Sequence, residues 1–120
     1  MHSNTPLPNW QTELANSFTD PLELLAHLNL KIEAPDALQD AARSFPFRVT
    51  KAYAGRIRKN DINDPLLRQV LPVADELHEQ AGFTSDPVGD LDRVATPGLL
   101  HKYQGRILMI ATGACAIHCR

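Results

Sequence analysis

The chain has 120 residues, of which 43% are hydrophobic and 22% are charged, and its formal net charge is -2. This length suits one ordinary domain, and the lack of a basic excess argues against a nucleic-acid partner. No apolar run approaches the roughly 20 residues that cross a bilayer, and the N-terminal sequence lacks the pattern of a signal peptide. We therefore expect a cytoplasmic protein with no nucleic-acid and no membrane partner.

The first half of the sequence predicts short helices. After a leader at residues 1–8, Trp10, Leu14 and Phe18 recur at helical spacing. Two further helices are expected to begin at Asp20-Pro21 and Asp64-Pro65, because the carboxylate can cap free amides and proline suits the first helical position. Their apolar positions are Leu22, Leu24, Leu25 and Leu28 in the first, and Leu66, Leu67, Val70 and Leu71 in the second.

Two more helices are predicted over residues 36–44 and 49–57, the latter with an exposed basic face at Arg56, Arg58 and Lys59. Pro72 should end or kink the helix that begins at Asp64-Pro65, before a further helical stretch through Leu77. Residues 83–98 are crowded with turn formers and predict an extended connection, in which Pro97-Gly98 suits the centre of a type II turn.

Two short apolar runs, 99–103 and 106–112, follow on either side of Gln104-Gly105. The continuous run from Ile107 to Ile110 is typical of a strand buried on both faces of a parallel sheet. One such strand cannot build a parallel sheet, so we expect an incomplete sheet. If the strand stays exposed, its free edge should cause self-association.

The only two cysteines, Cys115 and Cys119, come just after this strand. Two cysteines do not form a disulfide framework, which favours a reducing compartment. The residues alone leave three readings open: small buried side chains, a zinc site completed by His101 or His118, and part of an iron-sulfur site. The position of the pair after a strand favours the third reading, because loops at the carboxyl ends of barrel strands carry active-site residues.

The stretch CAIHCR resembles the opening of the C-x3-C-x2-C signature of radical S-adenosylmethionine enzymes. Together with HKYQGRILMIATGACAIHCR, the segments NDINDPLLRQVLP and DPVGD resemble the lysine 2,3-aminomutase family. The resemblance covers Phe45 to the end of the sequence and is closest to the branch that serves the (R)-β-lysylation of elongation factor P. It implies an isomerase, an intramolecular aminotransferase that converts L-α-lysine to (R)-β-lysine.

The family's cofactors are a 4Fe-4S cluster, S-adenosylmethionine and pyridoxal 5'-phosphate. The resemblance makes Cys115 and Cys119 two of three cluster ligands, with the third beyond Arg120. The motif H-K/R-Y-x-x-R places Lys102, Tyr103 and Arg106 at the phosphate of pyridoxal phosphate. A lysine, a phenol and a guanidinium suit a phosphate dianion.

The same resemblance gives His101 a structural role and puts His118 in the surroundings of the cluster, with no catalytic residue identified. It implies a mainly α N-terminal region that leads into the first strands of an incomplete α/β radical-SAM barrel of partial TIM type. The expected division is a helical region at 1–81, an extended connection at 82–98 and the start of the barrel at 99–120. We expect an N-terminal fragment that is inactive by itself, since two thiolates and an unfinished barrel cannot hold the cluster.

Two alternatives to an enzyme fragment remain at this stage, a non-catalytic helical interaction module that binds the translation factor and a small zinc-binding domain. The acidic residues Asp86, Asp90 and Asp92 favour a solvated turn over a divalent-cation site, because they lack a binding loop's regular spacing. The expected partners are L-lysine as substrate and proteins of the elongation factor P pathway, which the basic run could contact. The sequence leaves a homo-oligomer open.

Overall fold

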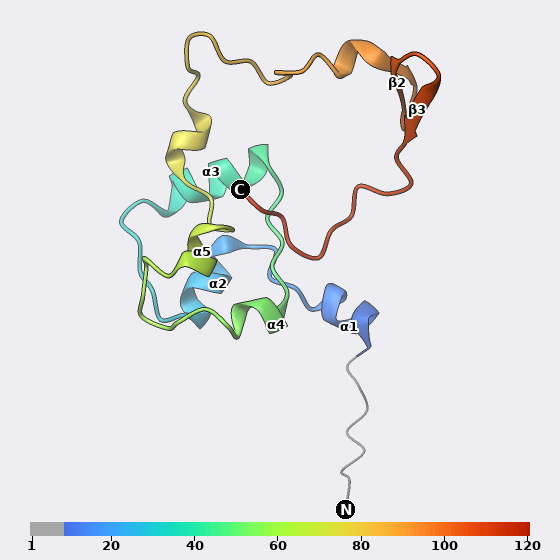
Figure 1. Ribbon diagram of the computed structural model, residues 1–120. Helices are drawn as coiled ribbons and strands as arrows, with labels where there is room; N and C mark the ends of the chain where they lie inside the picture. Colours follow the sequence, from blue (N-terminus) through green and yellow to red (C-terminus); the bar gives the residue numbers. More distant parts are fainter. Residues whose placement is uncertain (1–8) are drawn as a thin grey trace, which may run out of the picture. The chain divides into compact units, whose positions relative to one another are not determined.

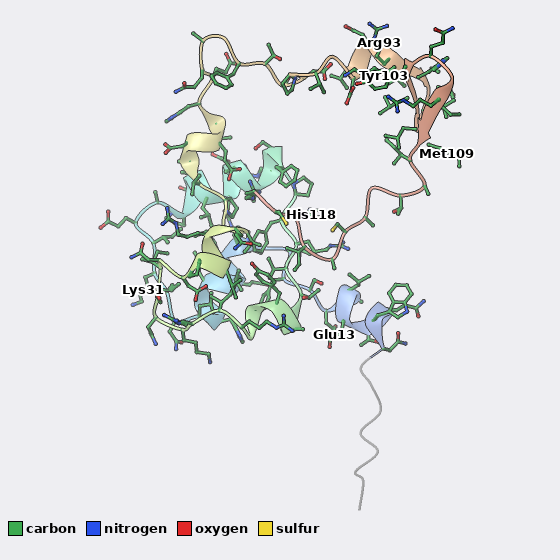
Figure 2. The ribbon with its side chains drawn as sticks, viewed as in Figure 1. Glu13, Lys31, Arg93, Tyr103, Met109 and His118 are labelled. Atoms are coloured by element: carbon green, nitrogen blue, oxygen red, sulfur yellow. The ribbon has the colours of Figure 1, made fainter. Side chains whose placement is uncertain are left out.

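The computed structural model describes residues 9–120, so the leader expected at residues 1–8 lies outside the described part (Figure 1). The described residues form two compact units. We call the residues up to His78, together with Cys115–Arg120, the helical unit, and Glu79–Ala114 the sheet unit. Figure 2 shows their side chains. No helix within residues 9–120 is both long enough and apolar enough to cross a membrane.

Within residues 9–78, the helical unit contains five short α-helices and one 3-10 helix. They are α1 (Trp10–Ala15), α2 (Pro21–His27), α3 (Pro35–Ser44), α4 (Lys51–Ala54), α5 (Pro65–Arg68) and η1 (Ala74–Leu77).

Both Asp-Pro pairs begin helices, as predicted. The Asp20 carboxylate accepts a hydrogen bond of 2.9 Å from the Leu22 amide at the start of α2. At the start of α5, one oxygen of Asp64 accepts from the amides of Leu66 and Leu67, at 2.9 and 3.1 Å. These bonds satisfy amides that have no partner inside the helix.

Two predicted helices are shorter than expected. The helix expected over residues 49–57 is limited to α4, after which Arg56 and Ile57 donate to carbonyls three residues earlier, as in a tightened last turn. The helix expected from Pro65 through Leu71 ends at Arg68. Val70 and Leu71 still donate to the Leu67 carbonyl in a last turn after α5, and Pro72, which has no N–H to donate, stops any continuation.

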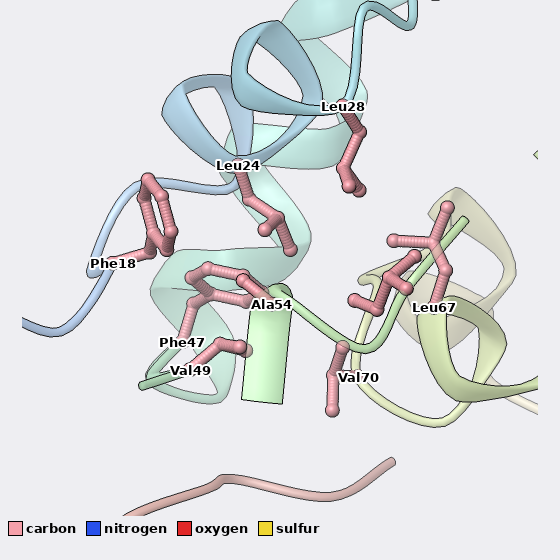
Figure 3. Close-up of a cluster of buried hydrophobic side chains, with 9 residues drawn as sticks. Phe18, Leu24, Leu28, Phe47, Val49, Ala54, Leu67 and Val70 are labelled. Atoms are coloured by element: carbon pink, nitrogen blue, oxygen red, sulfur yellow. The ribbon is translucent and has the colours of Figure 1, made fainter. Parts of the chain in front are cut away.

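The core of the helical unit gathers side chains from segments far apart in the sequence (Figure 3). The first predicted helix is present as α1, but Trp10, Leu14 and Phe18 do not share one buried face along it: Trp10 is 68% exposed, and Phe18 lies beyond the end of α1. Phe18 is buried because it forms an isolated antiparallel bridge with Val49, with N–O distances of 2.8 and 3.0 Å. The buried cluster comprises Phe18, Leu24, Leu28, Phe47, Val49, Ala54, Ile57, Leu67 and Val70.

The sheet unit contains a short 3-10 helix, η2 (Leu91–Arg93), and three antiparallel strands in the order β1 (Val94–Thr96), β2 (Leu99–Tyr103) and β3 (Arg106–Met109). Thr96 pairs with Leu99 across Pro97-Gly98. Gly98 has a φ of 80°, as the predicted type II turn requires.

The run from Ile107 to Ile110 was predicted to be a parallel strand buried on both faces, and this prediction is wrong. β3 pairs antiparallel with β2 at the edge of the sheet, and Ile107, Leu108 and Met109 are 60, 59 and 74% exposed. The reason is local: Gly105 has a φ of 77°, so Gln104-Gly105 closes a hairpin in which Tyr103 pairs with Arg106. The fold is thus a helical unit with a small antiparallel sheet, while the barrel and the predicted division into three regions stay predictions.

Candidate functional site

The three residues expected to bind a phosphate lie around one cavity of the sheet unit. Lys102 and Tyr103 end β2, and Arg106 begins β3, so the hairpin turn brings them together. The cavity has a volume of about 470 Å³ and is lined by Val88, Asp90, Leu100, Lys102, Tyr103, Arg106, Ile107 and Leu108.

Both cations of this cavity lie near the same aromatic ring. The Arg106 guanidinium carbon is 4.7 Å from the centre of the Tyr103 ring, and the Lys102 ammonium is 5.9 Å from it. These distances fall within the range of cation–π attraction. Tyr103 is labelled in Figure 2, at the hairpin end of the sheet unit. The ring therefore keeps two positive charges close together, an arrangement that a doubly charged anion would stabilise further.

Lys102 already has partners in this cavity. Its ammonium donates to the Asp90 carboxylate at 2.9 Å and to the carbonyl of Val88. The hydrogen bond to Asp90 raises the pKa of Lys102, although burial acts in the opposite direction. The lysine is therefore positively charged at neutral pH, and an incoming phosphate would compete with Asp90 for it.

The acidic residues before β1 form a turn, as the sequence favoured. Asp86 accepts hydrogen bonds from the amides of Asp90 and Leu91, at 2.9 and 3.0 Å, and so is occupied with backbone donors. Within residues 9–120, no group of three or more His, Cys, Asp or Glu side chains is placed to hold a metal ion. The described residues thus supply neither a calcium-type loop nor a closed zinc site.

The two cysteines are exposed, free thiols in the helical unit. Cys119 lines a cavity of about 690 Å³, whose other lining residues are Phe45, Ile62, Arg68, Leu71, Val73, Glu76 and Arg120. Burial raises the pKa of Tyr53, with smaller contributions from the nearby Cys119 and Asp64, and the Tyr53 hydroxyl donates to the Leu66 carbonyl at 2.7 Å. Cys119 therefore lies within electrostatic range of this phenol.

Hydrogen bonds attach the segment around Cys119 to the rest of the helical unit. The His118 amide donates to the carbonyl of Arg48 at 3.0 Å, and the Arg120 amide donates to that of Gln69 at 2.9 Å. The side chain of His118 contacts the Pro46 carbonyl through Nδ1 at 2.7 Å. His118 is labelled in Figure 2, where it lies among the side chains of the helical unit.

Thiol side chains are the donors that iron-sulfur clusters prefer, and the two cysteines expected as ligands are accessible and not bonded to each other. The residues present therefore fit two positions of the cluster's ligand set. The sequence contains no third cysteine, so these 120 residues supply only part of that set.

Sequence reasoning did not identify the partners that hold these site residues. The carbonyl of Pro46 is 72 positions from His118, and Glu76, which pairs with the Arg120 guanidinium, is 44 positions away. No local pattern signals such contacts. Asp90 offered a usable signal, since an acidic residue in a predicted turn is a candidate ion-pair partner for a lysine of a neighbouring strand.

No protein-family model matches the chain. The chain is 44% identical to the L-lysine 2,3-aminomutase of Escherichia coli over 98% of its own length. It is 38% identical to the L-lysine 2,3-aminomutase of Haemophilus influenzae and 30% identical to that of Clostridium subterminale, over 93% of its length in each case. The chain spans 34, 33 and 27% of the length of these three relatives.

These matches define the class: the chain is homologous to aminomutases across nearly all of its residues. More particularly, its family is that of the L-lysine 2,3-aminomutases, and the chain corresponds to about a third of such a protein. The family resemblance noted from the sequence motifs is thereby confirmed. Its narrower assignment to the elongation factor P branch stays a prediction.

Proposed function

We propose that the chain is part of a lysine 2,3-aminomutase, an isomerase that converts L-α-lysine to (R)-β-lysine. The observation that carries this proposal is the 44% identity to the Escherichia coli L-lysine 2,3-aminomutase over 98% of the chain. We place the product in the modification of elongation factor P, on the basis of the motif resemblance. The exposed basic run at Arg56, Arg58 and Lys59 is the surface that would contact an acidic protein of that pathway.

The proposed metal ligands are Cys115 and Cys119. Deprotonated, they would hold two irons of a 4Fe-4S cluster, which supplies the electron for cleaving S-adenosylmethionine. The exposure of both thiols supports this role, since a ligand must be reachable by iron and sulfide. The apolar walls beside Cys119, formed by Phe45, Leu71 and Val73, would limit water near the cluster.

The proposed phosphate site is the cavity between Lys102, Tyr103 and Arg106. When bound, pyridoxal phosphate would supply the conjugated system that stabilises the nitrogen as it migrates in a radical reaction. The chain's own residues would fix its phosphate: Arg106 by paired N–H donors, Tyr103 by its hydroxyl and Lys102 by its charge. The clustering of these three side chains around one cavity supports the assignment.

A phosphorus NMR titration of the chain with pyridoxal phosphate tests this site. We expect binding that weakens in Lys102→Gln and Arg106→Gln by roughly tenfold each, about 1.5 kcal/mol for a lost charge-assisted hydrogen bond. Asp90→Asn should strengthen binding, because it frees Lys102 from a competing carboxylate. Arg93→Gln, which removes an exposed arginine of the same unit outside the cavity, is the matched control. Equal affinity in all four variants would refute the site.

The 120-residue chain by itself should be catalytically inert, because its two thiolates cannot complete the ligand set of a 4Fe-4S cluster. Anaerobic reconstitution with iron and sulfide, followed by an assay for S-adenosylmethionine cleavage, tests this statement. A stable cluster that cleaves S-adenosylmethionine would overturn it. Metal analysis of chain purified without air would reveal zinc, if the two cysteines bind that metal instead.

A further inference from the structure

The two cysteines differ in how firmly the helical unit holds them. The residues on both sides of Cys119 donate backbone hydrogen bonds, His118 to Arg48 at 3.0 Å and Arg120 to Gln69 at 2.9 Å. These acceptors lie just before α4 and just after α5, so two separate segments of the helical unit hold the backbone around Cys119. The position of that backbone is therefore fixed by the fold and not by the segment itself.

Side chains add to this attachment on either side of the cysteine. A carbonyl can only accept, so Nδ1 of His118 must carry the proton that it shares with the Pro46 carbonyl at 2.7 Å. The His118 ring also packs against Phe45, with centroids 5.9 Å apart. Ile117, the next residue toward the N-terminus, packs against the buried core cluster.

The side chain of Arg120 is also firmly held, and only 7% of it is exposed. Its guanidinium pairs with Glu76 and donates to the Phe45 carbonyl, and it lies 5.1 Å from the centre of the Phe45 ring. Phe45 thus contacts both residues that flank Cys119. The Arg120 guanidinium therefore resists displacement, because losing Glu76 would leave a buried positive charge without its carboxylate partner.

Cys115 has no comparable support. Among the described residues, neither Cys115 nor Ala116 takes part in a backbone hydrogen bond outside regular elements. Nor does either residue belong to a helix or strand. The contrast between the two thiols is therefore one of anchoring and not of exposure, since both are exposed.

We propose that the helical unit presets Cys119 as the fixed cluster ligand, with His118 and Arg120 as positioning residues, and that Cys115 moves into place when iron binds. This inference rests on the proposed function, because it concerns the same cluster. Presetting one ligand lowers the ordering cost of assembling the site, since fewer backbone torsions remain to be fixed. It also assigns the N-terminal helices a part in the chemistry of a cluster to which they contribute no ligand.

Amide hydrogen exchange of the 120-residue chain, followed by NMR, tests the anchoring without any cluster. We expect the amides of His118 and Arg120 to be protected and that of Cys115 to exchange freely. His118→Ala should speed exchange at residue 118 roughly fivefold, the effect of one lost hydrogen bond, while His118→Asn restores protection by supplying a similar N–H donor. His101→Ala, which removes an exposed histidine of the sheet unit, is the matched control. Equal protection at Cys115 would overturn the inference.

A second experiment follows the cluster itself. It uses the full-length aminomutase of which this chain is proposed to be part, reconstituted with iron and sulfide without air. We expect His118→Ala, Arg120→Ala and the milder Glu76→Gln to alter the EPR spectrum and reduction potential of the cluster and to lower its iron content. Arg43→Ala, which removes an arginine paired with Asp40 at an exposed site, should change none of these. Far-UV circular dichroism confirms that each variant is folded.

The experiments distinguish a failure of the proposed function from a failure of this inference alone. If the wild-type enzyme takes up no cluster at Cys115 and Cys119, the proposed function fails and this inference fails with it. If the wild-type enzyme binds the cluster and the three variants show the same spectrum, potential and iron content, the inference alone is overturned.

Discussion

The helical unit and the sheet unit are stabilised in different ways. The helical unit buries a cluster of nine apolar residues drawn from α2, α4, α5 and the segments that precede, join and follow these helices. In the sheet unit, large apolar side chains such as Leu91, Ile107 and Met109 remain 60% exposed or more. Its three strands depend on backbone pairing and turn chemistry. The hydrophobic core should therefore dominate the stability of the helical unit. Strand pairing and the conformation of the turns should dominate the stability of the sheet unit.

The largest test of this contrast removes buried and exposed leucines in turn. Leu67 is fully buried in α5, and Leu67→Ala should lower the free energy of unfolding by about 2–5 kcal/mol, because it leaves a cavity. Leu108 is 59% exposed in β3, and Leu108→Ala should change the free energy of unfolding by less than about 0.5 kcal/mol. Urea unfolding followed by circular dichroism measures both. Equal losses in the two variants would show that the sheet unit shares a core with other parts of the chain.

The second test concerns a charge that supports the helical unit. Asp64 is only 3% exposed, and burial by itself would raise its pKa. Hydrogen bonds from the amides of Arg58, Leu67 and Leu66, helped by the Arg58 charge, outweigh burial and lower the pKa of Asp64 below its usual 3.8. A carboxyl with a lowered folded-state pKa adds stability above its unfolded pKa, and this is lost as the pH falls through the folded value.

Asp64→Asn should therefore lower the free energy of unfolding at neutral pH and flatten its decline below pH 4. Acid titration of unfolding, with the amides of Leu66 and Leu67 followed by NMR, measures this effect. Asp36→Asn replaces an exposed carboxylate in the first turn of α3 and serves as control. An unchanged acid profile in Asp64→Asn would mean that the buried carboxylate does not support α5.

The sequence predicted those parts of the fold that short-range chemistry determines. Asp20-Pro21, Asp64-Pro65 and Pro97-Gly98 each specify a cap or a turn within three or four residues, and each prediction is confirmed. The prediction for Phe18 failed because its burial depends on pairing with Val49, thirty-one positions away. The prediction for Ile107 to Ile110 failed because an apolar run predicts a buried strand, whereas the nearest pairing partner is the antiparallel β2.

The residues of the candidate sites also fall into those that short-range sequence specifies and those that tertiary packing positions. Lys102, Tyr103 and Arg106, which the motif assigned to a phosphate, line one cavity because a two-residue turn brings them together, while their binding of phosphate stays a prediction. The competing pair between Lys102 and Asp90 spans twelve positions, and the attachment of His118 to Pro46 spans seventy-two. Such contacts are decided by tertiary packing, which local patterns do not encode.

The third test addresses the turn that creates the sheet unit's hairpin. Gly105 has a φ of 77°, so Gly105→Ala should weaken the β2–β3 pairing by about 1–2 kcal/mol, the penalty of the left-handed region for a residue with a Cβ. Gly113→Ala is the matched control, since Gly113 has no positive φ and an added Cβ would meet no atom within 4 Å. Faster amide exchange in β3 of the first variant alone would support the turn's role. If the helical unit's amides accelerated equally, the two units would not be independent.

The smallest expected effect concerns association of the exposed edge. β3 ends the strand order and presents unpaired backbone groups next to Ile107, Leu108 and Met109, which favours pairing with a strand of another copy. Ile107→Lys adds a charge to this edge and should lower the mass measured by light scattering at high protein concentration. Ile62→Lys makes the same change at a 44% exposed isoleucine of the helical unit and should leave the mass unchanged. A wild-type chain that scatters as a monomer at all concentrations would contradict this, and would mean that backbone pairing within three strands is enough to keep an apolar edge soluble.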